Sequence, residues 1–363
     1  MSPVNVTLIV ETLRHRVPGG IGVATQALRD RLIASDDVVV DEYWARGGVG
    51  GQSSMLPRPL LYEAWSRVGR PAIGGPSTSE RGIDVLHAPM LFGPTQCGVP
   101  TIFTVHDLAW RGDHDVRSRR SVRLHERMWQ RIVASRATVI TSTETMAGTL
   151  VEAGLAAERC VVIPLGVESR EAVEPSEILE PGSPYILSVS TLEPRKNLAG
   201  LLDAFRLSGL WSDGYELVIV GPDGWELEIA TLIETQPREV AQGVRTLGYV
   251  SDAELGALYR AAAAAAYPSF SEGFGLPVLE AMSWGTPVVT SSHGSTAEVA
   301  GAAGILVDPS RPDDIAAGLV AATDPARRAG LGAAGLARAA ELSWDSHVER
   351  TIGLYRDVSG SRG

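Results

Sequence analysis

Short apolar segments rich in β-branched residues alternate with helical segments along this 363-residue chain. This alternation predicts βαβ units, in which helices cover both faces of a parallel sheet. A chain of this length with 44% hydrophobic residues can build two such domains, each with its own core. We therefore predict an α/β protein with two doubly wound domains.

The first 165 residues form the predicted N-terminal domain. A glycine-containing loop after the first strand leads to a helical segment at residues 23–32. Residues 60–68 are an amphipathic segment within an irregular region rich in Gly, Pro and Ser. The short β-branched runs predict a parallel, Rossmann-like sheet. Its predicted strands are residues 4–10, 83–87, 100–105, 137–141 and 160–164.

An acidic, proline-containing stretch at residues 166–182 is the predicted linker to a C-terminal Rossmann-like domain, residues 183–343. Two doubly wound domains facing each other place a ligand cleft between them, at the carboxyl ends of the strands. Residues 344–363 carry a last helix that we expect to pack back onto the N-terminal domain. The second domain's predicted strands are residues 185–189, 216–220, 244–247, 261–267, 287–290 and 304–307, with a helix at 198–205. The last helix has apolar positions at Trp344, Val348, Ile352 and Tyr355.

Two carboxylates, Glu272 and Glu280, flank two glycines and a proline where a strand is followed by a helix. Gly273 and Gly275 let a ligand approach the main chain, and N–H groups at a helix start favour phosphate oxygens. A carboxylate does not bind phosphate, so acids on both sides of an anion site suggest hydroxyl-rich groups such as a ribose and a sugar. The segment predicts a nucleotide-sugar site. An alternative is that the acids only stabilise the helix dipole and the glycines are ordinary loop residues.

Composition excludes several classes of function. The net charge of −11 does not favour nucleic acid or a general attraction to anionic membranes. The two cysteines, Cys97 and Cys160, have no C-x-x-C partner and predict reduced thiols in a cytoplasm. The apolar residues 4–10 are too few, and too soon followed by Glu11, for a signal peptide. No apolar run reaches the ~18 residues of a membrane span, so we expect any membrane contact to be peripheral.

With seven residues between the two glutamates, the chain resembles the retaining GT-B glycosyltransferases of glycosyltransferase family 4. The segment Ser190-Thr-Leu-Glu-Pro-Arg-Lys-Asn-Leu198 resembles the strand, loop and helix that carry an Arg-Lys pair in that family. Further resemblances occur in the same order at residues 217–221, 247–250, 280–289 and 304–309. The N-terminal half matches more sparsely, at residues 19–22 and 105–107.

The resemblance implies a role for each residue of the donor site. Glu272 would accept hydrogen bonds from the donor sugar and Glu280 from the ribose, each worth roughly 1.5–3 kcal/mol. Val250 would contact the base through its main chain, which leaves no readable code for the base. Main-chain groups would line the donor at Gly273, Phe274, Gly275 and Leu276.

Arg195 and Lys196 are the predicted counter-charges of the reaction. Glycosyl transfer builds negative charge on the departing diphosphate, and fixed cations can stabilise this charge where a metal would otherwise serve. An adjacent Arg-Lys pair on a solvated surface is the alternative. Lys196 is the only lysine in the chain, which argues against a phosphorylase that needs a separate lysine for pyridoxal phosphate.

In the N-terminal half, Gly19, Gly20 and Gly22 are expected to close the loop after the first strand, where relatives approach the diphosphate and the acceptor. They lack the third glycine of a dinucleotide fingerprint, and a plain tight turn is the alternative. The resemblance places His106 after a strand, where relatives contact the donor sugar. A structural histidine is the alternative, and we do not assign His106 as a general base.

We predict no metal and no cofactor. Asp113-His-Asp115 spells D-x-D, but it lies in a polar loop rather than at a strand end, and we interpret it as coincidental. No His or Cys cluster has zinc spacing.

The acceptor is least defined by the sequence. Arg119, Arg123, Arg127 and Arg131 recur at four-residue spacing, so on a helix of residues 118–134 they form one basic stripe. An anionic lipid-linked acceptor or a membrane surface is one explanation, with Trp65 of the amphipathic segment assisting. A solvated charged face is the other.

The sequence therefore predicts a cytoplasmic, retaining, metal-independent glycosyltransferase acting on a glycan, lipid-linked or small-molecule acceptor. The basic segment has the form Glu193-Pro-Arg-Lys-Asn197, which resembles mannosyltransferases of polysaccharide assembly. GDP-mannose is therefore the first prediction for the donor, and a UDP-sugar is the alternative. Other GT-B reactions, phosphorolysis or epimerisation, are rivals. A sugar-nucleotide-binding protein without turnover is a rival from another class.

Overall fold

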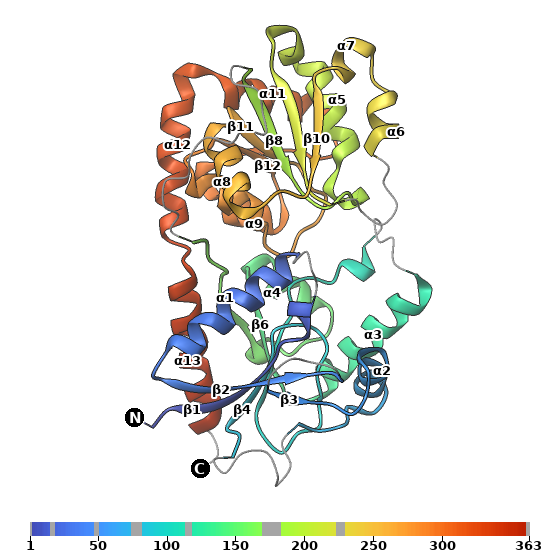
Figure 1. Ribbon diagram of the computed structural model, residues 1–363, viewed down its shortest axis with the longest axis vertical. Coiled ribbons are helices and arrows are strands. Elements are labelled where there is room, and N and C mark those ends of the chain that lie inside the picture. Colours follow the sequence, from blue (N-terminus) through green and yellow to red (C-terminus); the bar gives the residue numbers. More distant parts are fainter. Residues whose placement is uncertain are drawn as a thin grey trace. The chain divides into compact units, whose positions relative to one another are not determined.

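The computed structural model of the chain describes residues 2–14, 19–46, 51–73, 82–112, 118–168, 183–222 and 229–360. The chain divides into two compact units, and Figure 1 shows a sheet with surrounding helices in each. Unit 1 comprises Met1–Arg111, Arg117–Leu165 and Trp344–Gly363, and unit 2 comprises Gly112–Val116 and Gly166–Ser343. Two α/β units with parallel sheets confirm the fold class that the alternation predicted.

Unit 1 is built on a seven-stranded parallel sheet in the order β3-β2-β1-β4-β5-β6-β7. Its strands are β1 (Val4–Ile9), β2 (Val38–Trp44), β3 (Gln52–Ser53), β4 (Val85–Ala88), β5 (Thr101–Thr104), β6 (Thr138–Thr141) and β7 (Cys160–Val162). Its helices are α1 (Gly20–Ala34), α2 (Arg58–Val68), α3 (Arg119–Ala134), α4 (Glu144–Glu152) and α13 (Trp344–Gly360). Short 3-10 helices span Glu11–Arg14, Ala109–Arg111 and Ala157–Arg159.

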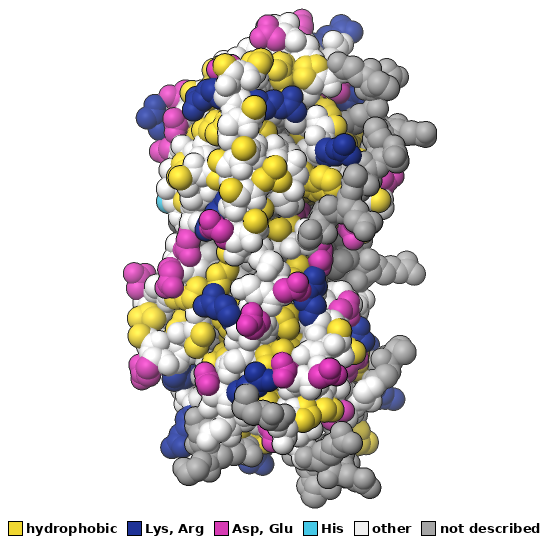
Figure 2. Space-filling model, turned by 90° about the vertical axis from the view of Figure 1, so that its left-hand side faces the viewer, with side chains coloured by type: hydrophobic (Ala, Val, Ile, Leu, Met, Phe, Trp, Pro, Cys, Tyr) yellow, Lys and Arg dark blue, Asp and Glu magenta, His cyan; other side chains and the backbone are white. Residues whose placement is uncertain are grey.

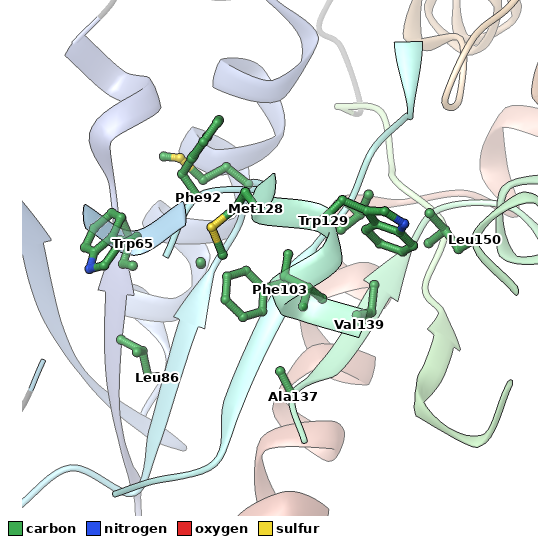
Figure 3. Close-up of a cluster of buried hydrophobic side chains, with 14 of the residues drawn as sticks. Trp65, Leu86, Phe92, Phe103, Met128, Trp129, Ala137, Val139 and Leu150 are labelled. Carbon is green, nitrogen blue, oxygen red and sulfur yellow. The ribbon is translucent and has the colours of Figure 1, made fainter. Parts of the chain in front are cut away.

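The unit 1 sheet is buried on both faces because successive strand residues point to opposite sides. In β5, Ile102 joins the core beneath α1 and α13, whereas Phe103 joins the core beneath α2 and α3. Figure 3 shows the second of these cores, where Met128 and Trp129 of α3 lie near Phe103. Both residues of α3 are fully buried, so this helix is fixed by packing along one side.

The C-terminal helix α13 packs on unit 1, as predicted. Its residues Val348, Ile352 and Tyr355 belong to the same buried cluster as strand β1 and helix α1. Arg31 of α1 also pairs with Asp345 of α13 at 2.9 Å.

On the face drawn in Figure 2, Lys and Arg side chains lie among Asp and Glu side chains rather than forming one continuous basic area.

Unit 2 is built on a six-stranded parallel sheet in the order β10-β9-β8-β11-β12-β13. Its strands are β8 (Tyr185–Val189), β9 (Glu216–Val220), β10 (Val244–Gly248), β11 (Ala264–Tyr267), β12 (Val288–Ser291) and β13 (Ile305–Val307). Its helices are α5 (Leu198–Ser208), α6 (Ile229–Glu234), α7 (Arg238–Ala241), α8 (Asp252–Ala261), α9 (Leu276–Ser283), α10 (Gly294–Ala300), α11 (Pro312–Thr323) and α12 (Pro325–Ala340). Short 3-10 helices span Pro194–Lys196, Leu210–Asp213 and Gly301–Ala303.

The structure corrects several sequence predictions. Strand β2 was not predicted, although it pairs with β1 along its length. The predicted strand at residues 261–267 is shorter, because helix α8 extends to Ala261 and β11 begins only at Ala264. Trp65 is fully buried, so it cannot assist a membrane contact.

Within the described residues, no helix combines the length and the apolar character needed to span a membrane.

Candidate functional site

The candidate site lies in unit 2, where the strand order reverses. Strand β8 pairs with β9 on one side and with β11 on the other. Ligands of doubly wound sheets bind at such a switch point, beyond the carboxyl ends of the strands. Arg195 and Lys196 follow β8, and Glu272 follows β11, so the topology brings residues 76–77 positions apart into contact.

Glu272 joins both predicted cations in one cluster. Its Oε1 accepts a hydrogen bond from Lys196 Nζ at 2.6 Å, and its Oε2 accepts one from Arg195 Nη1 at 2.9 Å. Arg195 Nε also donates to Glu193 Oε2 at 2.7 Å. Lys196 Nζ donates to the hydroxyl of Tyr267 at 2.6 Å. The sequence placed Glu272 against the sugar and the cations against the diphosphate, and did not anticipate this direct pairing.

The cluster is buried and charged. The Glu272 and Lys196 side chains are 9% and 7% exposed. Burial acts to raise the pKa of Glu272, but the charges of Lys196 and Arg195 outweigh it and hold this pKa at about 2. Burial lowers the pKa of Lys196, an effect that the charge of Glu272 opposes. A buried pair of this kind needs both partners, because either charge alone would be costly.

The loop that carries the cations is held from three sides. Asn197 adopts a left-handed conformation with φ of 58°. Its buried side-chain amide donates to Pro268 O at 3.1 Å and to Pro309 O at 2.6 Å, in the loops after β11 and β13. The Phe270 N–H donates to Arg195 O at 2.8 Å. Lys196 is therefore presented from a fixed loop, which is what a preorganised site requires.

Helix α9 begins directly after the glycine segment, as predicted, with Pro277 in its first turn. Gly275 has φ of +100°, and a Cβ there would come within 2.7 Å of Thr296 Cγ2, so only glycine fits. Glu280 lies one turn into the helix, and its Oε2 accepts a hydrogen bond from the Tyr259 hydroxyl at 3.1 Å. Two carboxylates thus flank the start of α9 with different partners.

The other predicted donor contacts involve the main chain. The side chains of Phe274, Leu276 and Val250 are 5%, 8% and 8% exposed, and Gly273 is also buried. Buried side chains leave the peptide groups as the means of contact. Val250 follows β10 at the same edge of the sheet as the cations.

The predicted residues of the N-terminal half lie in unit 1. His106 follows β5, is partly buried, and its Nε2 lies 3.4 Å from Pro89 O. Burial lowers the pKa of His106. The expectation that three glycines close a loop was wrong for two of them. Gly20 begins helix α1 and Gly22 lies inside it, Gly19 is the N-cap, and none of the three has a positive φ.

The sequence did not predict Tyr267, Glu193 or Asn197 as members of this cluster. Glu193 and Asn197 belong to the segment that carries the family resemblance, and Tyr267 ends a predicted strand. A signal existed for Asn197, because Asn is favoured among non-glycine residues in a left-handed turn before a helix. No local signal marks Tyr267, since its partner Lys196 is 71 residues away.

Among the described residues, no group of three or more His, Cys, Asp or Glu side chains is arranged to hold a metal ion. The D-x-D sequence at residues 113–115 lies outside the described residues.

Comparison with known proteins assigns the family. The model of Glycosyltransferase Family 4 matches residues 18–171, and that of Glycosyl transferases group 1 matches residues 169–329. The chain belongs to glycosyltransferase family 4. The two models follow each other along the chain and meet near the start of unit 2.

Curated relatives include mannosyltransferases. O-antigen chain mannosyltransferase B of Escherichia coli is 44% identical over 175 residues, which cover 47% of this chain and 45% of that protein. D-inositol 3-phosphate glycosyltransferase of Acidothermus cellulolyticus is 32% identical over 304 residues, covering 73% of this chain and 63% of that protein. The chain therefore spans 45–63% of the length of these relatives.

Solved structures share the fold. Sucrose-phosphate synthase of Thermosynechococcus elongatus superposes with a TM-score of 0.74 at 19% identity, covering 99% of this chain and 100% of that one. Anabaena Alr3699/HepE, solved with UDP and glucose, has a TM-score of 0.69 at 15% identity, covering 98% and 100%. At these identities the likeness shows that the chain shares the GT-B fold.

Proposed function

We propose that the chain transfers a mannosyl group from GDP-mannose, with retention of configuration, to a glycan or lipid-linked acceptor. One observation carries the proposal: Arg195, Lys196 and Glu272 form a buried charged cluster at the switch point of the unit 2 sheet. The family assignment supports a nucleotide-sugar donor, and the name of the 44% identical relative supports mannose.

The cluster offers groups for both parts of the donor. An ammonium has three N–H donors, and within the described residues Lys196 Nζ contacts only Tyr267 and Glu272. The remaining N–H and the Arg195 guanidinium are proposed to bind the diphosphate as it departs. A carboxylate accepts about four hydrogen bonds, so Glu272 can hold both cations and still accept from a sugar hydroxyl. Glu280, at the other end of the glycine segment, is proposed to bind the ribose.

The proposed reaction needs no general base from the protein. The bond from the anomeric carbon to the diphosphate oxygen breaks, and the acceptor oxygen forms its bond on the same face of the sugar. The acceptor proton passes to the departing phosphate. Fixed cations lower the barrier by stabilising the charge on that phosphate, and loss of one such donor typically costs about 10²–10³ in rate.

GDP-mannose and UDP-sugars remain separable by experiment. The mannosyltransferase relative supports the first, and a UDP-sugar is the alternative donor that the sequence predicted. GDP-mannose and UDP-glucose should each be incubated with the protein without acceptor, with release of nucleoside diphosphate measured. We expect slow hydrolysis of GDP-mannose, and NMR of the first transfer product should show an α-linked sugar. If only UDP-glucose is hydrolysed, the donor is a UDP-sugar and not GDP-mannose. If a nucleotide-sugar binds tightly but is neither hydrolysed nor transferred, the chain is a non-catalytic binding protein.

For the acceptor, we propose that the start of α3 contacts an anionic surface. The structure narrows the basic stripe, because Arg127 pairs with Glu63 of α2 at 2.9 Å. Arg131 donates to Ser66 O of α2 at 3.0 Å. Arg119 and Arg123 are exposed. The stripe therefore divides into a half that holds α2 and a half that faces solvent.

Vesicle sedimentation tests this surface. Replacing Arg119 and Arg123 with Gln should weaken binding to vesicles that contain anionic lipid, and should leave binding to neutral vesicles unchanged. Each basic residue near such a surface is worth about 1 kcal/mol. Arg206, an exposed arginine of unit 2, provides the control substitution. Equal binding by wild type and the double variant would reject the surface.

A further inference from the structure

Lys196 has one charged partner and one neutral partner. Its ammonium donates to Glu272 and to the Tyr267 hydroxyl, both at 2.6 Å. Glu272 balances the charge of the ammonium. Because Glu272 lies in a loop, its carboxylate can also compete with a ligand for the ammonium. The neutral hydroxyl fixes the direction of the ammonium without cancelling its charge. The two partners therefore do different things for Lys196.

The contact with Tyr267 is made through the hydroxyl and not through the ring face. Lys196 Nζ lies 2.6 Å from the hydroxyl oxygen but 5.1 Å from the ring centroid. Tyr267 is 6% exposed, and burial together with the charge of Glu272 raises its pKa well above the ordinary value. The hydroxyl is neutral in this environment and accepts a charge-assisted hydrogen bond.

Tyr267 is itself rigidly placed. It is the last residue of β11, which pairs with β8 on one side and β12 on the other. Its carbonyl accepts a hydrogen bond from Thr290 Oγ1 of β12 at 2.9 Å. Lys196, in contrast, ends a short 3-10 helix in a loop. A residue of the central sheet thus fixes a side chain of the loop, which is how precise sites are supported.

We propose that Tyr267 is a positioning residue whose hydroxyl aims the ammonium of Lys196 at the departing diphosphate. The proposal rests on the proposed function, since it names how one cation of that site is held. In Tyr267→Phe, the ammonium would keep only Glu272 and lie against it. The charge would remain, but its direction toward the diphosphate would be lost.

The single lysine makes a direct test possible. Protein labelled with ¹³C at lysine Cε gives one lysine signal, which reports Lys196 without assignment. The signal should be recorded for wild type, Tyr267→Phe and Tyr185→Phe, each with and without GDP, GDP-mannose, UDP and UDP-glucose. Tyr185→Phe is the matched control, because it also removes a buried hydroxyl of unit 2, one that donates to Leu258 O at 2.7 Å. Steady-state kinetics and a pH titration of the signal complete the comparison.

We expect the wild-type signal to shift when a nucleoside diphosphate binds. In Tyr267→Phe the free-protein signal should move, and kcat should fall about ten-fold to a hundred-fold with a smaller change in donor KM. The lysine should also titrate at lower pH, because a hydrogen bond to its charged form is lost. The charged or titratable groups facing Lys196 are Glu193, Arg195, Tyr267 and Glu272, and only Tyr267 is altered. Tyr185→Phe should match wild type in all three measurements.

Two kinds of failure are distinguishable. If no nucleotide or nucleotide-sugar shifts the wild-type signal, the proposed donor site is wrong, whatever Tyr267 does. If nucleotides shift it but Tyr267→Phe keeps the wild-type signal, titration and kcat, the positioning role alone is rejected. Equal losses in Tyr267→Phe and Tyr185→Phe would also reject it, because a buried hydroxyl of any kind would then have the same effect.

Discussion

Each unit contains a buried polar cluster, and the two clusters differ in whether all of their hydrogen-bonding groups have a partner within the protein. In unit 1, His87 Nδ1 lies 2.6 Å from the Tyr355 hydroxyl of α13, and Nε2 lies 2.9 Å from Thr104 Oγ1. Both ring nitrogens of His87 are occupied. In unit 2, Lys196 has two protein partners for its three donors within the described residues.

The clusters also differ in charge and position. Burial lowers the pKa of His87 to about 3, so the imidazole is neutral and belongs to the packing of α13 on the sheet. Glu272, with a pKa of about 2, is ionised among cations at the carboxyl ends of the strands. A neutral, saturated cluster fixes architecture, whereas a charged one with a spare donor at a strand end is suited to a ligand. Four predictions test this contrast.

The largest effect is expected at Glu272. Glu272→Ala removes the acceptor that the buried Lys196 and the partly buried Arg195 share, and turnover should fall by about 10²–10³. Affinity for GDP itself should be kept or increased, because a competing carboxylate is gone. Glu272→Gln, which can still accept from one cation, should lie between. Kinetics and calorimetric titration with GDP check this, and equal losses of turnover and GDP affinity would place Glu272 outside the sugar pocket.

The next effect is a loss of stability in acid that arises in unit 1. The folded-state pKa values of His87 and His347, about 3 and about 4, are both depressed by burial. Below an unfolded pKa of about 6.5 the unfolded chain therefore binds more protons than the folded chain. The free energy of unfolding should fall by about 2.7 kcal/mol per pH unit as the pH drops from about 6 to 4.5. Urea unfolding at several pH values measures this slope, and a flat profile would contradict the burial of both histidines.

A smaller effect is expected at Asn197, which holds the loop of Lys196. Asn197→Gly keeps the left-handed conformation but loses two hydrogen bonds, at a cost of about 1–3 kcal/mol. Asn197→Asp should cost more, because its carboxylate oxygens would face the carbonyls of Pro268 and Pro309. The melting temperature and kcat should both decrease in the order wild type, Asn197→Gly, Asn197→Asp. If Asp were tolerated better than Gly, the two amide hydrogen bonds would not be what holds the loop.

The smallest effect is expected for Tyr355→Phe in unit 1. Losing the hydroxyl leaves one nitrogen of His87 unpaired and should cost about 1–2 kcal/mol of stability. Because this cluster is architectural, kcat and donor KM at a temperature well below melting should equal those of wild type. A loss of kcat comparable to that of Tyr267→Phe would erase the distinction between the two clusters.

Sequence reasoning predicted the fold, and it proposed Arg195, Lys196 and Glu272, because the fold and these residues are marked by local patterns. The β-branched runs predicted five of the seven unit 1 strands, and Pro277 after two glycines predicted the start of α9. The contacts that hold the site are not local. Lys196 meets Tyr267 and Glu272 only because β8 and β11 are neighbours in the sheet, and this order is not written in either segment.

The start of α1 shows the opposite limit. Three nearby glycines indicated a loop, yet the helix begins at Gly20 and includes Gly22. Helix propensity predicted the reverse, since glycine disfavours a helix interior by about 1 kcal/mol relative to alanine. Helix α1 nevertheless forms from Gly20 and packs against β2 and α13. Local propensity decides only where tertiary contacts do not.

The cluster is proposed to bind the diphosphate of a nucleotide-sugar through its two cations, Arg195 and Lys196, with Glu272 accepting from the sugar. Calorimetric titration of wild type and Lys196→Met with GDP, and with guanosine as the phosphate-free control, tests it most directly. Wild type should bind GDP much more tightly than guanosine, and Lys196→Met should lose most of this difference while still binding guanosine. Equal affinity of wild type and Lys196→Met for GDP would contradict it.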